Sequence, residues 1–229
     1  MSILQEIPIH PVPIDRFIAI VGASSVQQVE QLAATLRTRA AERIIWNVSS
    51  TAVGGGVAEM LPRLLSYVRS IGVDARWVVI SGGPEFFRIT KRIHNALHGE
   101  PGDGSPLDDV ARGVYEETLE KNAEELLSRV RPRDVVILHD PQTLGLAPYV
   151  ERAGAVPVWR CHIGTDDQNE ESTLGWAFLR PYLRQAAFFV FSRLPYAPAS
   201  VPRDRIAVIA PSIDPFAPKN QPLDEDVVR

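Results

Sequence analysis

The sequence is poor in residues that several classes of protein depend on. Its 229 residues include one cysteine, Cys161, which excludes an internal disulfide and a cysteine-rich zinc site. No compact ligand spacing predicts any other metal site. The net charge of −4 comes from mixed charges with no basic block, so no nucleic-acid partner is expected. No apolar run is long enough to span a membrane and no secretion signal opens the chain, so we predict a cytoplasmic protein with no membrane partner.

Short apolar segments alternate with segments of helical spacing along most of the chain. The expected strands are 43–47, 75–80, 134–138, 156–161, 187–191 and 206–209. Apolar strands that alternate with helices are typical of a parallel sheet covered on both faces. The sequence therefore predicts an α/β fold, a Rossmann-like open parallel sheet with helices on both faces.

Three regions are expected along the chain. Residues 1–42 are predicted to form an extended, proline-containing arm and a helix over 25–40, which a Ser25–Gln28 capping box would begin. Residues 43–210 are predicted to form the Rossmann-like domain, and 211–229 a proline-rich tail. Within the domain, Pro62 is expected to kink or shorten the helix over 57–71. A helix over 107–130 is expected to turn five apolar residues inward: Val110, Val114, Leu119, Leu126 and Leu127.

A glycine-rich turn follows the first strand of the predicted domain. The segment Trp46-Asn-Val-Ser-Ser-Thr-Ala-Val-Gly-Gly-Gly-Val-Ala-Glu-Met60 runs from a strand through Gly54, Gly55 and Gly56 into a helix. The first free N–H groups of such a helix bind phosphate readily. The spacing matches neither a P-loop nor the G-x-G-x-x-G dinucleotide fingerprint. A plain glycine-rich connection explains the triplet equally well.

Polar residues gather at the ends of other predicted strands. His139 and Asp140 follow the strand over 134–138, and His162 follows the strand over 156–161. In parallel sheets ligands bind beyond the carboxyl ends of the strands, so these residues are candidates for an active site. The alternatives are structural histidines and a helix cap at Asp140. These observations leave a dinucleotide enzyme and a nucleotide-sugar enzyme both open.

Other polar residues have simpler interpretations. Ser49, Ser50 and Thr51 lack the surroundings of a nucleophile and are expected to shape the turn. Lys91, His94 and Asn95 form a polar helix face that a solvated surface explains, although a ligand-facing role is open. Trp46, Trp77 and Trp159 lie in strands and are expected to be core residues.

Five ordered motifs resemble one family of enzymes. They are the glycine segment 46–60, Thr90-Lys-Arg-Ile-His-Asn-Ala-Leu-His-Gly99, His139-Asp-Pro-Gln142, Trp159-Arg-Cys-His-Ile163 and Pro211-Ser-Ile-Asp-Pro215. Together they resemble the retaining glycosyltransferases (family 4) that make trehalose from a nucleotide-diphospho-glucose and glucose, and the related trehalose phosphorylases. Such enzymes have two Rossmann-like domains, the arrangement called GT-B. This sequence matches only the N-terminal, acceptor-side domain, and we expect the chain to be a fragment or a half-length relative.

The resemblance implies roles for particular residues. His162 and Asp140 would be catalytic, with His162 against the donor sugar and Asp140 in the acceptor pocket. Donor phosphate would lie at Gly54, Gly55, Gly56 and Val57. Sugar contacts would come from Glu59, Lys91, Asn95, His139, Gln142 and Arg160. The implied chemistry is displacement with retention in which the leaving phosphate takes the acceptor's proton. No cofactor is implied; the partners would be nucleotide-diphospho-glucose, glucose and trehalose, with a homodimer as a further expectation.

Three alternatives stay open beside the glucosyltransferase. One is a phosphorylase of the same superfamily, and another is a non-catalytic module that binds sugar or a partner subunit. An NAD-dependent oxidoreductase is disfavoured because the glycine pattern is wrong and no acidic residue closes the second strand. The donor's nucleotide would be chosen by a domain that this sequence lacks.

Overall fold

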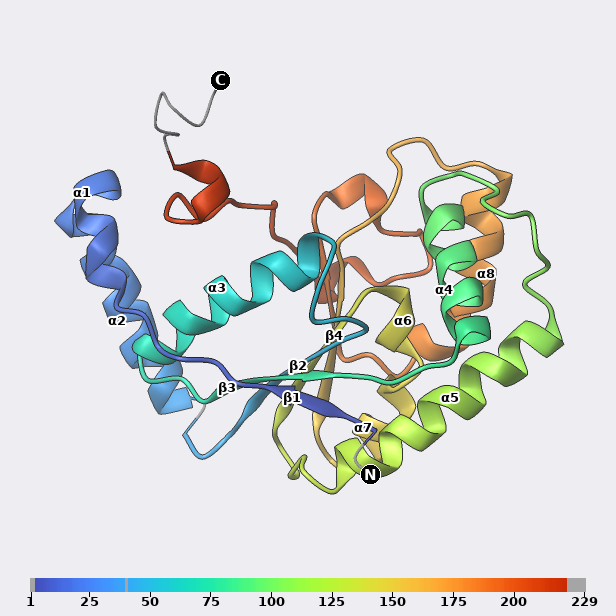
Figure 1. Cartoon of the computed structure of the whole chain (residues 1–229), viewed down its shortest axis with the longest axis horizontal. Coiled ribbons are helices and arrows are strands. Elements are labelled where there is room, and N and C mark those ends of the chain that lie inside the picture. The colour runs from blue at the N-terminus through green and yellow to red at the C-terminus, as the bar shows by residue number, and fades with distance from the viewer. Residues whose placement is uncertain (1–2, 40, 222–229) are drawn as a thin grey trace.

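The computed structural model describes residues 3–39 and 41–221. Its centre is a single sheet of seven strands in the order β1-β3-β2-β4-β5-β6-β7 (Figure 1). β1 pairs antiparallel with β3, and every other neighbouring pair is parallel. The strands are β1 (Gln5–Ile7), β2 (Ile45–Ser49), β3 (Ala75–Val79), β4 (Val135–His139), β5 (Val156–Cys161), β6 (Phe188–Phe191) and β7 (Ile206–Val208).

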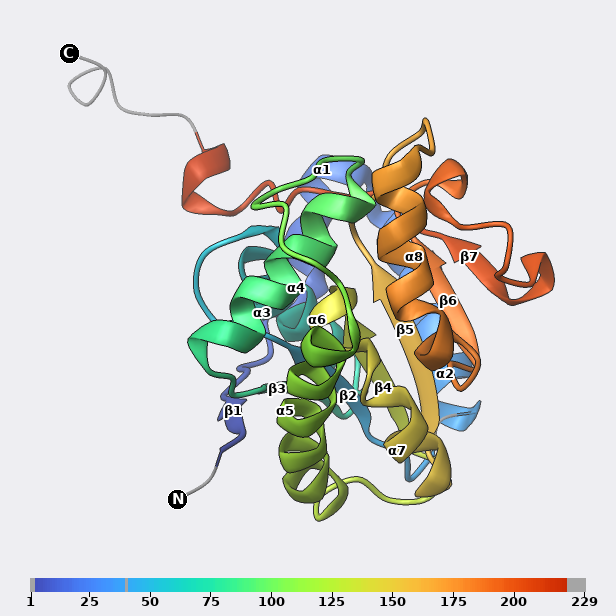
Figure 2. The ribbon, with the colours of Figure 1, turned by 90° about the vertical axis from the view of Figure 1, so that its right-hand side faces the viewer.

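Helices cover the sheet from both sides, as Figures 1 and 2 show. The helices are α1 (Ile18–Val21), α2 (Ala23–Arg39), α3 (Gly56–Ser70), α4 (Pro84–Leu97), α5 (Asp109–Leu127), α6 (Asp140–Leu144), α7 (Ala147–Arg152) and α8 (Glu170–Leu183). Apolar side chains of α4, α5, α7 and α8 join the strands in the larger core. Leu61 and Leu65 of α3 form a smaller core with Trp77 on the other side. The predicted Rossmann-like α/β fold is confirmed.

The three strand tryptophans are core residues, as predicted. Trp46, Trp77 and Trp159 are all essentially unexposed. A buried indole N–H needs an acceptor, and each of the three has one. Trp46 donates to the carboxylate of Asp134 at 3.1 Å, and Trp77 donates to the hydroxyl of Ser49 at 2.8 Å. Trp159 donates to the carbonyl of Asp140 at 3.0 Å. The last two acceptors lie at the strand ends, so core packing also positions the residues of the candidate site.

The N-terminal region differs from the prediction. Part of the predicted arm is a strand, because Gln5–Ile7 pairs with the edge of β3. Ser25 does not form the predicted capping box, because its hydroxyl donates to the carbonyl of Val21 four residues earlier. Ser25 therefore lies within the first turn of α2 and not before it. α2 begins earlier, at Ala23, and buries only Val26 and Ala33. Leu32 of this helix is 70% exposed, so its apolar stripe covers little of the sheet.

Predictions about two other helices hold only in part. α3 is a single helix over Gly56–Ser70, so Pro62 does not shorten it, and the alternative of a kink stays a prediction. The hydroxyl of Ser66, one turn after Pro62, donates to the Pro62 carbonyl. In α5, Leu119 and Leu126 are buried as predicted, whereas Val110 is 75% exposed because Ala111 and Tyr115 face the core in the first turns.

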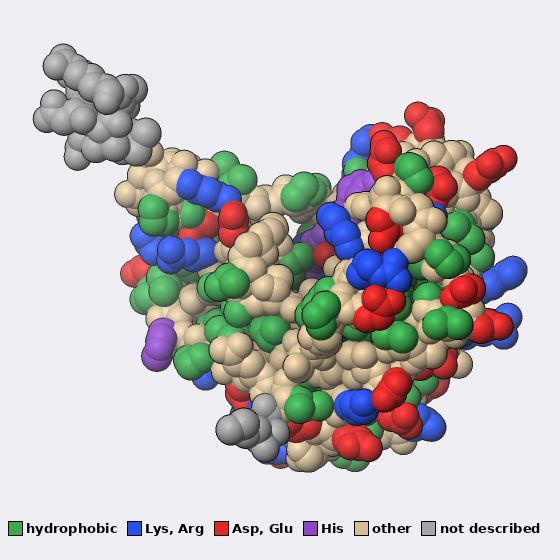
Figure 3. Space-filling model, turned by 45° about the vertical axis from the view of Figure 1, so that its right-hand side comes forward, with side chains coloured by type: hydrophobic (Ala, Val, Ile, Leu, Met, Phe, Trp, Pro, Cys, Tyr) green, Lys and Arg blue, Asp and Glu red, His purple; other side chains and the backbone are tan. Residues whose placement is uncertain are grey.

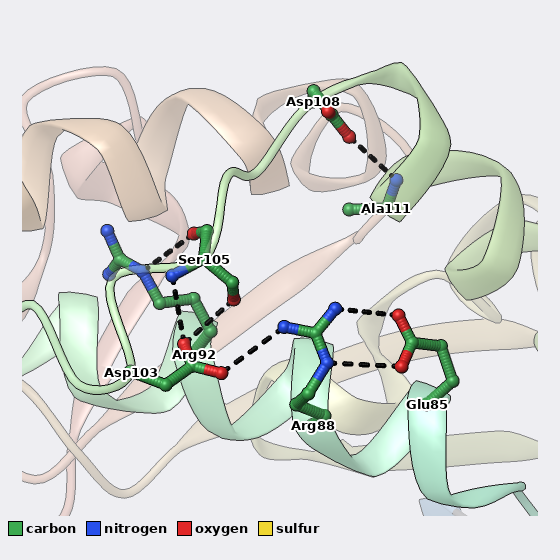
Figure 4. A network of polar contacts seen from close by, with 7 residues as sticks. All are labelled: Glu85, Arg88, Arg92, Asp103, Ser105, Asp108 and Ala111. Atoms are coloured by element: carbon green, nitrogen blue, oxygen red, sulfur yellow. Dashed lines mark hydrogen bonds and ion pairs between the residues drawn. The ribbon is translucent and has the colours of Figure 1, made fainter.

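The loop between α4 and α5 is exposed, and an ionic network ties it to α4 (Figure 4). Arg88 donates to Glu85 at 2.6 Å and to Asp103 of the loop at 3.2 Å. Asp103 in turn accepts the backbone N–H and the hydroxyl of Ser105. Ser105 offers its carbonyl to the buried Arg92 at 3.1 Å. This loop is therefore anchored at both ends of its turn.

The described part of the tail lies against α3. The Asp214 carboxylate accepts the Tyr67 hydroxyl at 3.1 Å, and Phe216 packs edge-on against Phe17 at 5.1 Å. Lys219 forms an ion pair with Glu59. The rest of the predicted tail, 222–229, lies outside the described residues. Within the described ranges no helix is long and apolar enough to cross a membrane.

Candidate functional site

The candidate site lies where the chain order of the sheet reverses. β2 has β3 on one side and β4 on the other, so the loops that leave β2 and β4 diverge there. Ligands of open α/β sheets bind outside the carboxyl ends of the strands at such a point. The glycine loop follows β2, His139 and Asp140 follow β4, and His162 follows β5. Figure 3 shows a hollow in the surface with histidine side chains inside it.

The glycine loop has the backbone conformation that only glycine adopts easily. Gly54 and Gly55 have φ of 73° and 86°, and Gly55 is the N-cap of α3. The first bond of the helix runs from Glu59 N–H to the Gly55 carbonyl at 3.2 Å. The N–H groups of 56–58 precede that bond and have no acceptor within the helix. A Cβ added at 54, 55 or 56 would meet nothing within 4 Å, so the glycines bound open space. This helix start is suited to an anion.

The residues before the glycines shape the turn, as predicted. The Ser49 hydroxyl donates to the Thr51 carbonyl at 3.1 Å. The Thr51 hydroxyl donates to the Val53 carbonyl at 2.6 Å and accepts the Val53 N–H at 3.1 Å. These bonds fix the part of the turn that precedes the glycines.

The two predicted histidines are in direct contact. Nδ1 of His139 lies 2.9 Å from Nε2 of His162, and the rings are nearly parallel at 13°. Nε2 of His139 lies 3.1 Å from Oδ1 of Asn47. His139 is buried, whereas His162 is partly exposed. Polar side chains from β2, β4 and the end of β5 therefore form one hydrogen-bonded row.

Asp140 joins the ends of β4 and β5. Its Oδ1 accepts the backbone N–H of His162 at 2.8 Å, and its carbonyl accepts the indole N–H of Trp159 at 3.0 Å. Asp140 has a positive φ of 60°, which is uncommon outside glycine and recurs at functional sites. It is the first residue of α6, and its carboxylate does not cap that helix. The cap alternative is therefore replaced by a bond between strands.

Burial sets the charges of this group. It lowers the pKa of His139 well below the ordinary value, with help from His162 and Arg160. Burial, reinforced by the cation of Arg160, lowers the pKa of His162 to about 4. Burial raises the pKa of Asp140 to about 7 against the opposing bond from His162 and the charge of Arg160. Both histidines are therefore neutral at neutral pH, and Asp140 keeps its proton to a higher pH than an ordinary carboxyl group.

The remaining predicted sugar contacts are more scattered. The Gln142 Oε1 is buried without a partner among the described residues, as is Nδ1 of His94 on α4. Lys91 is exposed and Asn95 is half-buried, and the Asn95 amide lies against Gly102. Glu59 is engaged with Lys219 of the tail. The structure therefore brings His139, Asp140, His162 and Arg160 together. Asn95 and Glu59 have other neighbours, Gly102 and Lys219, and Lys91 lies exposed on α4.

Asn47 was missed at the level of sequence. It lies in the middle of an apolar strand and is 3% exposed. A buried amide in a central strand needs hydrogen-bond partners, so an asparagine within this apolar strand was the sequence feature that could have indicated a site residue. Its partners are the side chain of His139 and the carbonyl of Arg76. Both lie on neighbouring strands, so the sequence did not reveal them.

The arrangement combines an anion-binding helix start with a neutral row that forms hydrogen bonds. Neutral imidazoles and a carboxyl group suit hydroxyl groups, which donate and accept. Among the described residues no group of three or more His, Cys, Asp or Glu side chains could hold a metal ion. The chemistry of this edge suits hydroxyls at the row and an anionic group at the helix start.

Known proteins resemble this chain over most of its length. A family model described as "Trehalose synthase, N-terminal domain" matches residues 47–198. The trehalose synthase of Thermococcus litoralis is 34% identical over 91% of this chain and 48% of its own length. The trehalose synthase of Rubrobacter xylanophilus is 33% identical over 87% of this chain and 46% of its own length. The trehalose phosphorylase of Pleurotus sajor-caju is 30% identical over 89% of this chain and 29% of its own length. The chain spans about half the length of the trehalose synthases it matches.

Proposed function

Because the chain belongs to the family of trehalose synthase N-terminal domains, we propose that it is the acceptor-side part of a trehalose-forming glucosyltransferase. The donor would be a nucleotide-diphospho-glucose and the acceptor glucose, in a reversible transfer. We further propose that it acts in the cytoplasm and as a homodimer.

The observation that carries this proposal is the shared edge at the reversal of strand order. A helix start with free N–H groups at 56–58 lies on the same edge as the row of His139, His162 and Asp140. A nucleotide-sugar offers a diphosphate next to a ring of hydroxyls. The helix start suits the diphosphate, and the neutral row suits the sugar.

The proposed roles follow from these positions. The N–H groups at the start of α3 would face the donor's phosphates, with Gly54 and Gly55 keeping the approach open. His162 would bind a hydroxyl of the donor sugar. Asp140 would bind acceptor hydroxyls, assisted by the unpartnered amide oxygen of Gln142. Arg160 would counter negative charge near Asp140.

The transfer is a substitution at the anomeric carbon of the donor glucose. The bond between that carbon and the phosphate oxygen breaks, and a bond to an acceptor hydroxyl oxygen forms on the same face. The acceptor's proton passes to the departing phosphate oxygen, so nucleoside diphosphate and trehalose are the products. No second carboxylate is needed as a base, and catalysis would come from positioning and charge stabilisation.

A phosphorylase is the second candidate, since the phosphorylase of Pleurotus sajor-caju is 30% identical over most of this chain. It would use inorganic phosphate where the synthase uses a nucleoside diphosphate. The higher identity to trehalose synthases, 34% for that of Thermococcus litoralis, favours the synthase.

Calorimetric titration of the chain tests the proposal. We expect weak binding of glucose and trehalose and little binding of ADP-glucose or UDP-glucose. Asp140→Ala should weaken glucose binding roughly tenfold or more, because it removes hydrogen bonds to a carboxyl group. Glu117→Gln, at an exposed ion pair on α5, is the matched control and should change nothing. Glucose binding that Asp140→Ala leaves unaltered would overturn the proposal.

A further inference from the structure

The hydrogen bond at one end of the row fixes which atom donates and which accepts in every other bond of the row. The carbonyl of Arg76 on β3 accepts hydrogen bonds and donates none. The Nδ2 of Asn47 lies 3.4 Å from it and is the donor. The amide oxygen of Asn47 therefore faces the other way, towards His139 at 3.1 Å.

That orientation determines which nitrogen of His139 holds its proton. An amide oxygen accepts, so Nε2 of His139 must donate and must be protonated. His139 is buried and neutral, so its Nδ1 has no proton and accepts. The nearest group to that Nδ1 is Nε2 of His162 at 2.9 Å, which must then be the donor.

His162 lies at the open end of the row. With its proton on Nε2, neutral His162 has an unprotonated Nδ1. Among the described residues Nδ1 of His162 has no protein partner, and the ring is only partly buried. A bare ring nitrogen accepts a hydrogen bond from a hydroxyl and cannot donate one to a phosphate oxygen.

We infer that Asn47 and His139 are positioning residues that fix the tautomer of His162 and thereby dedicate its Nδ1 to accepting a hydroxyl of the bound sugar. The identification of the hydroxyl as a sugar's rests on the proposed function. The tautomer itself rests on the contacts of the row and on the neutral charge of the two buried rings. Polar partners that fix the tautomer of a functional histidine recur in other sites.

The direct test is nitrogen NMR of the histidine rings in the unaltered chain, with assignments made by substituting single histidines. Long-range proton–nitrogen spectra distinguish protonated from unprotonated ring nitrogens. At neutral pH we expect the proton of both His139 and His162 on Nε2. A proton on Nδ1 of His162 would overturn the inference, whatever the chain binds.

Two substitutions of Asn47 test whether its amide oxygen sets the tautomer of His162. Asn47→Asp keeps an oxygen acceptor for His139 and should keep the tautomer of His162. Asn47→Leu removes the acceptor, so His139 is free to turn its proton to Nδ1 and reverse the row. We expect a proton on Nδ1 of His162 in this variant, and an unchanged tautomer would contradict the relay. If Asn47→Leu does not fold, the parent and Asn47→Asp spectra still decide.

Binding adds the second readout. Trehalose carries a glucose unit that would occupy the donor-sugar position beside His162. Its affinity should fall about tenfold in Asn47→Leu and stay near the parent value in Asn47→Asp, as expected for one lost hydrogen bond. A set of deoxytrehaloses should contain one sugar that binds the parent weakly and is insensitive to Asn47→Leu. If no deoxytrehalose behaves so, the hydroxyl assignment is wrong. If trehalose does not bind at all while the spectra match, the proposed function fails and the tautomer assignment stands.

Discussion

The carboxylate of Asp140 accepts the backbone N–H of His162 at 2.8 Å, so one acidic side chain connects the ends of β4 and β5. The same residue offers its carbonyl to Trp159 at 3.0 Å and has a positive φ of 60°. Asp140 is thus held by its backbone and its side chain at once. Asp140 therefore connects the two strand ends that carry the histidines of the candidate site.

The first prediction concerns pH. The pKa of Asp140 is raised to about 7, so the folded chain binds more protons than the unfolded chain between about pH 4 and 7. This group's contribution to the free energy of unfolding is present at low pH and is lost as pH rises through 7. His162, with its pKa lowered to about 4, contributes in the opposite direction: its stability is lost as pH falls from about 6.5 to 4.

Asp140→Asn removes only the first of these contributions. The difference in unfolding free energy, parent minus variant, should fall by about 3 kcal/mol between pH 4 and 7. Urea titrations at several pH values measure it. A difference that is flat across this range would show that Asp140 titrates normally in the folded chain.

The glycine loop gives a second prediction. Gly55→Ala should destabilise the chain by about 1–2 kcal/mol, because alanine is strained at a φ of 86°. Gly56→Ala is the matched control: it lies one residue later at the start of α3, without a positive φ, and should be neutral or slightly stabilising. Chemical denaturation compares the two. Equal costs would mean that backbone conformation is not what these glycines provide.

The third prediction concerns the support beneath Asp140. The buried hydroxyl of Tyr115 donates to the Pro141 carbonyl at 2.7 Å and accepts the Gly145 N–H at 2.9 Å, so it holds both ends of α6. Tyr115→Phe removes the hydroxyl donor of the Pro141 carbonyl and one of two acceptors of the Gly145 N–H, which also bonds to the Thr143 carbonyl. The substitution should cost about 1–2 kcal/mol. Tyr149→Phe, on the half-buried ring of α7, should cost far less in the same thermal unfolding experiment. Similar losses would contradict the assigned role.

Much of the fold could be predicted from the sequence, because the parallel strands are short apolar runs between turns. β1 could not, since Gln5–Ile7 is short and its pairing with β3 spans more than seventy residues. The apolar spacing of α2 predicted a helix correctly but not that Leu32 would be exposed. Periodicity identifies an apolar stripe and does not say what covers it.

The site was predictable in part for a related reason. The ends of parallel strands share an edge, so the strand pattern alone predicts that His139, Asp140 and His162 lie together. The contact between Asn47 and His139 joins residues 92 apart, and the direction of neither side chain follows from the sequence. The ion pair between Glu59 and Lys219 likewise depends on the path of the tail.

The tail supplies the fourth prediction. Asp214 accepts the Tyr67 hydroxyl and also the backbone N–H of Phe216 at 3.0 Å. Asp214→Ala should free the segment 211–221 from α3 and speed tryptic cleavage after Lys219 severalfold. Asp204→Ala, at an exposed carboxylate before β7, is the control and should leave the cleavage rate unchanged. Equal cleavage rates in the parent and in both variants would show that Asp214 does not anchor the tail.

The central claim is that this edge of the sheet binds a sugar through His162 and Asp140. The most direct measurement is a trehalose titration of the chain with nitrogen-labelled histidines, because trehalose carries a glucose unit for each of the two positions. The account predicts that the ring signals of His162 shift saturably, that those of the exposed His10 do not, and that Asp140→Ala removes or weakens the response. Saturable trehalose binding that leaves the His162 signals unmoved would place the sugar elsewhere and contradict the account.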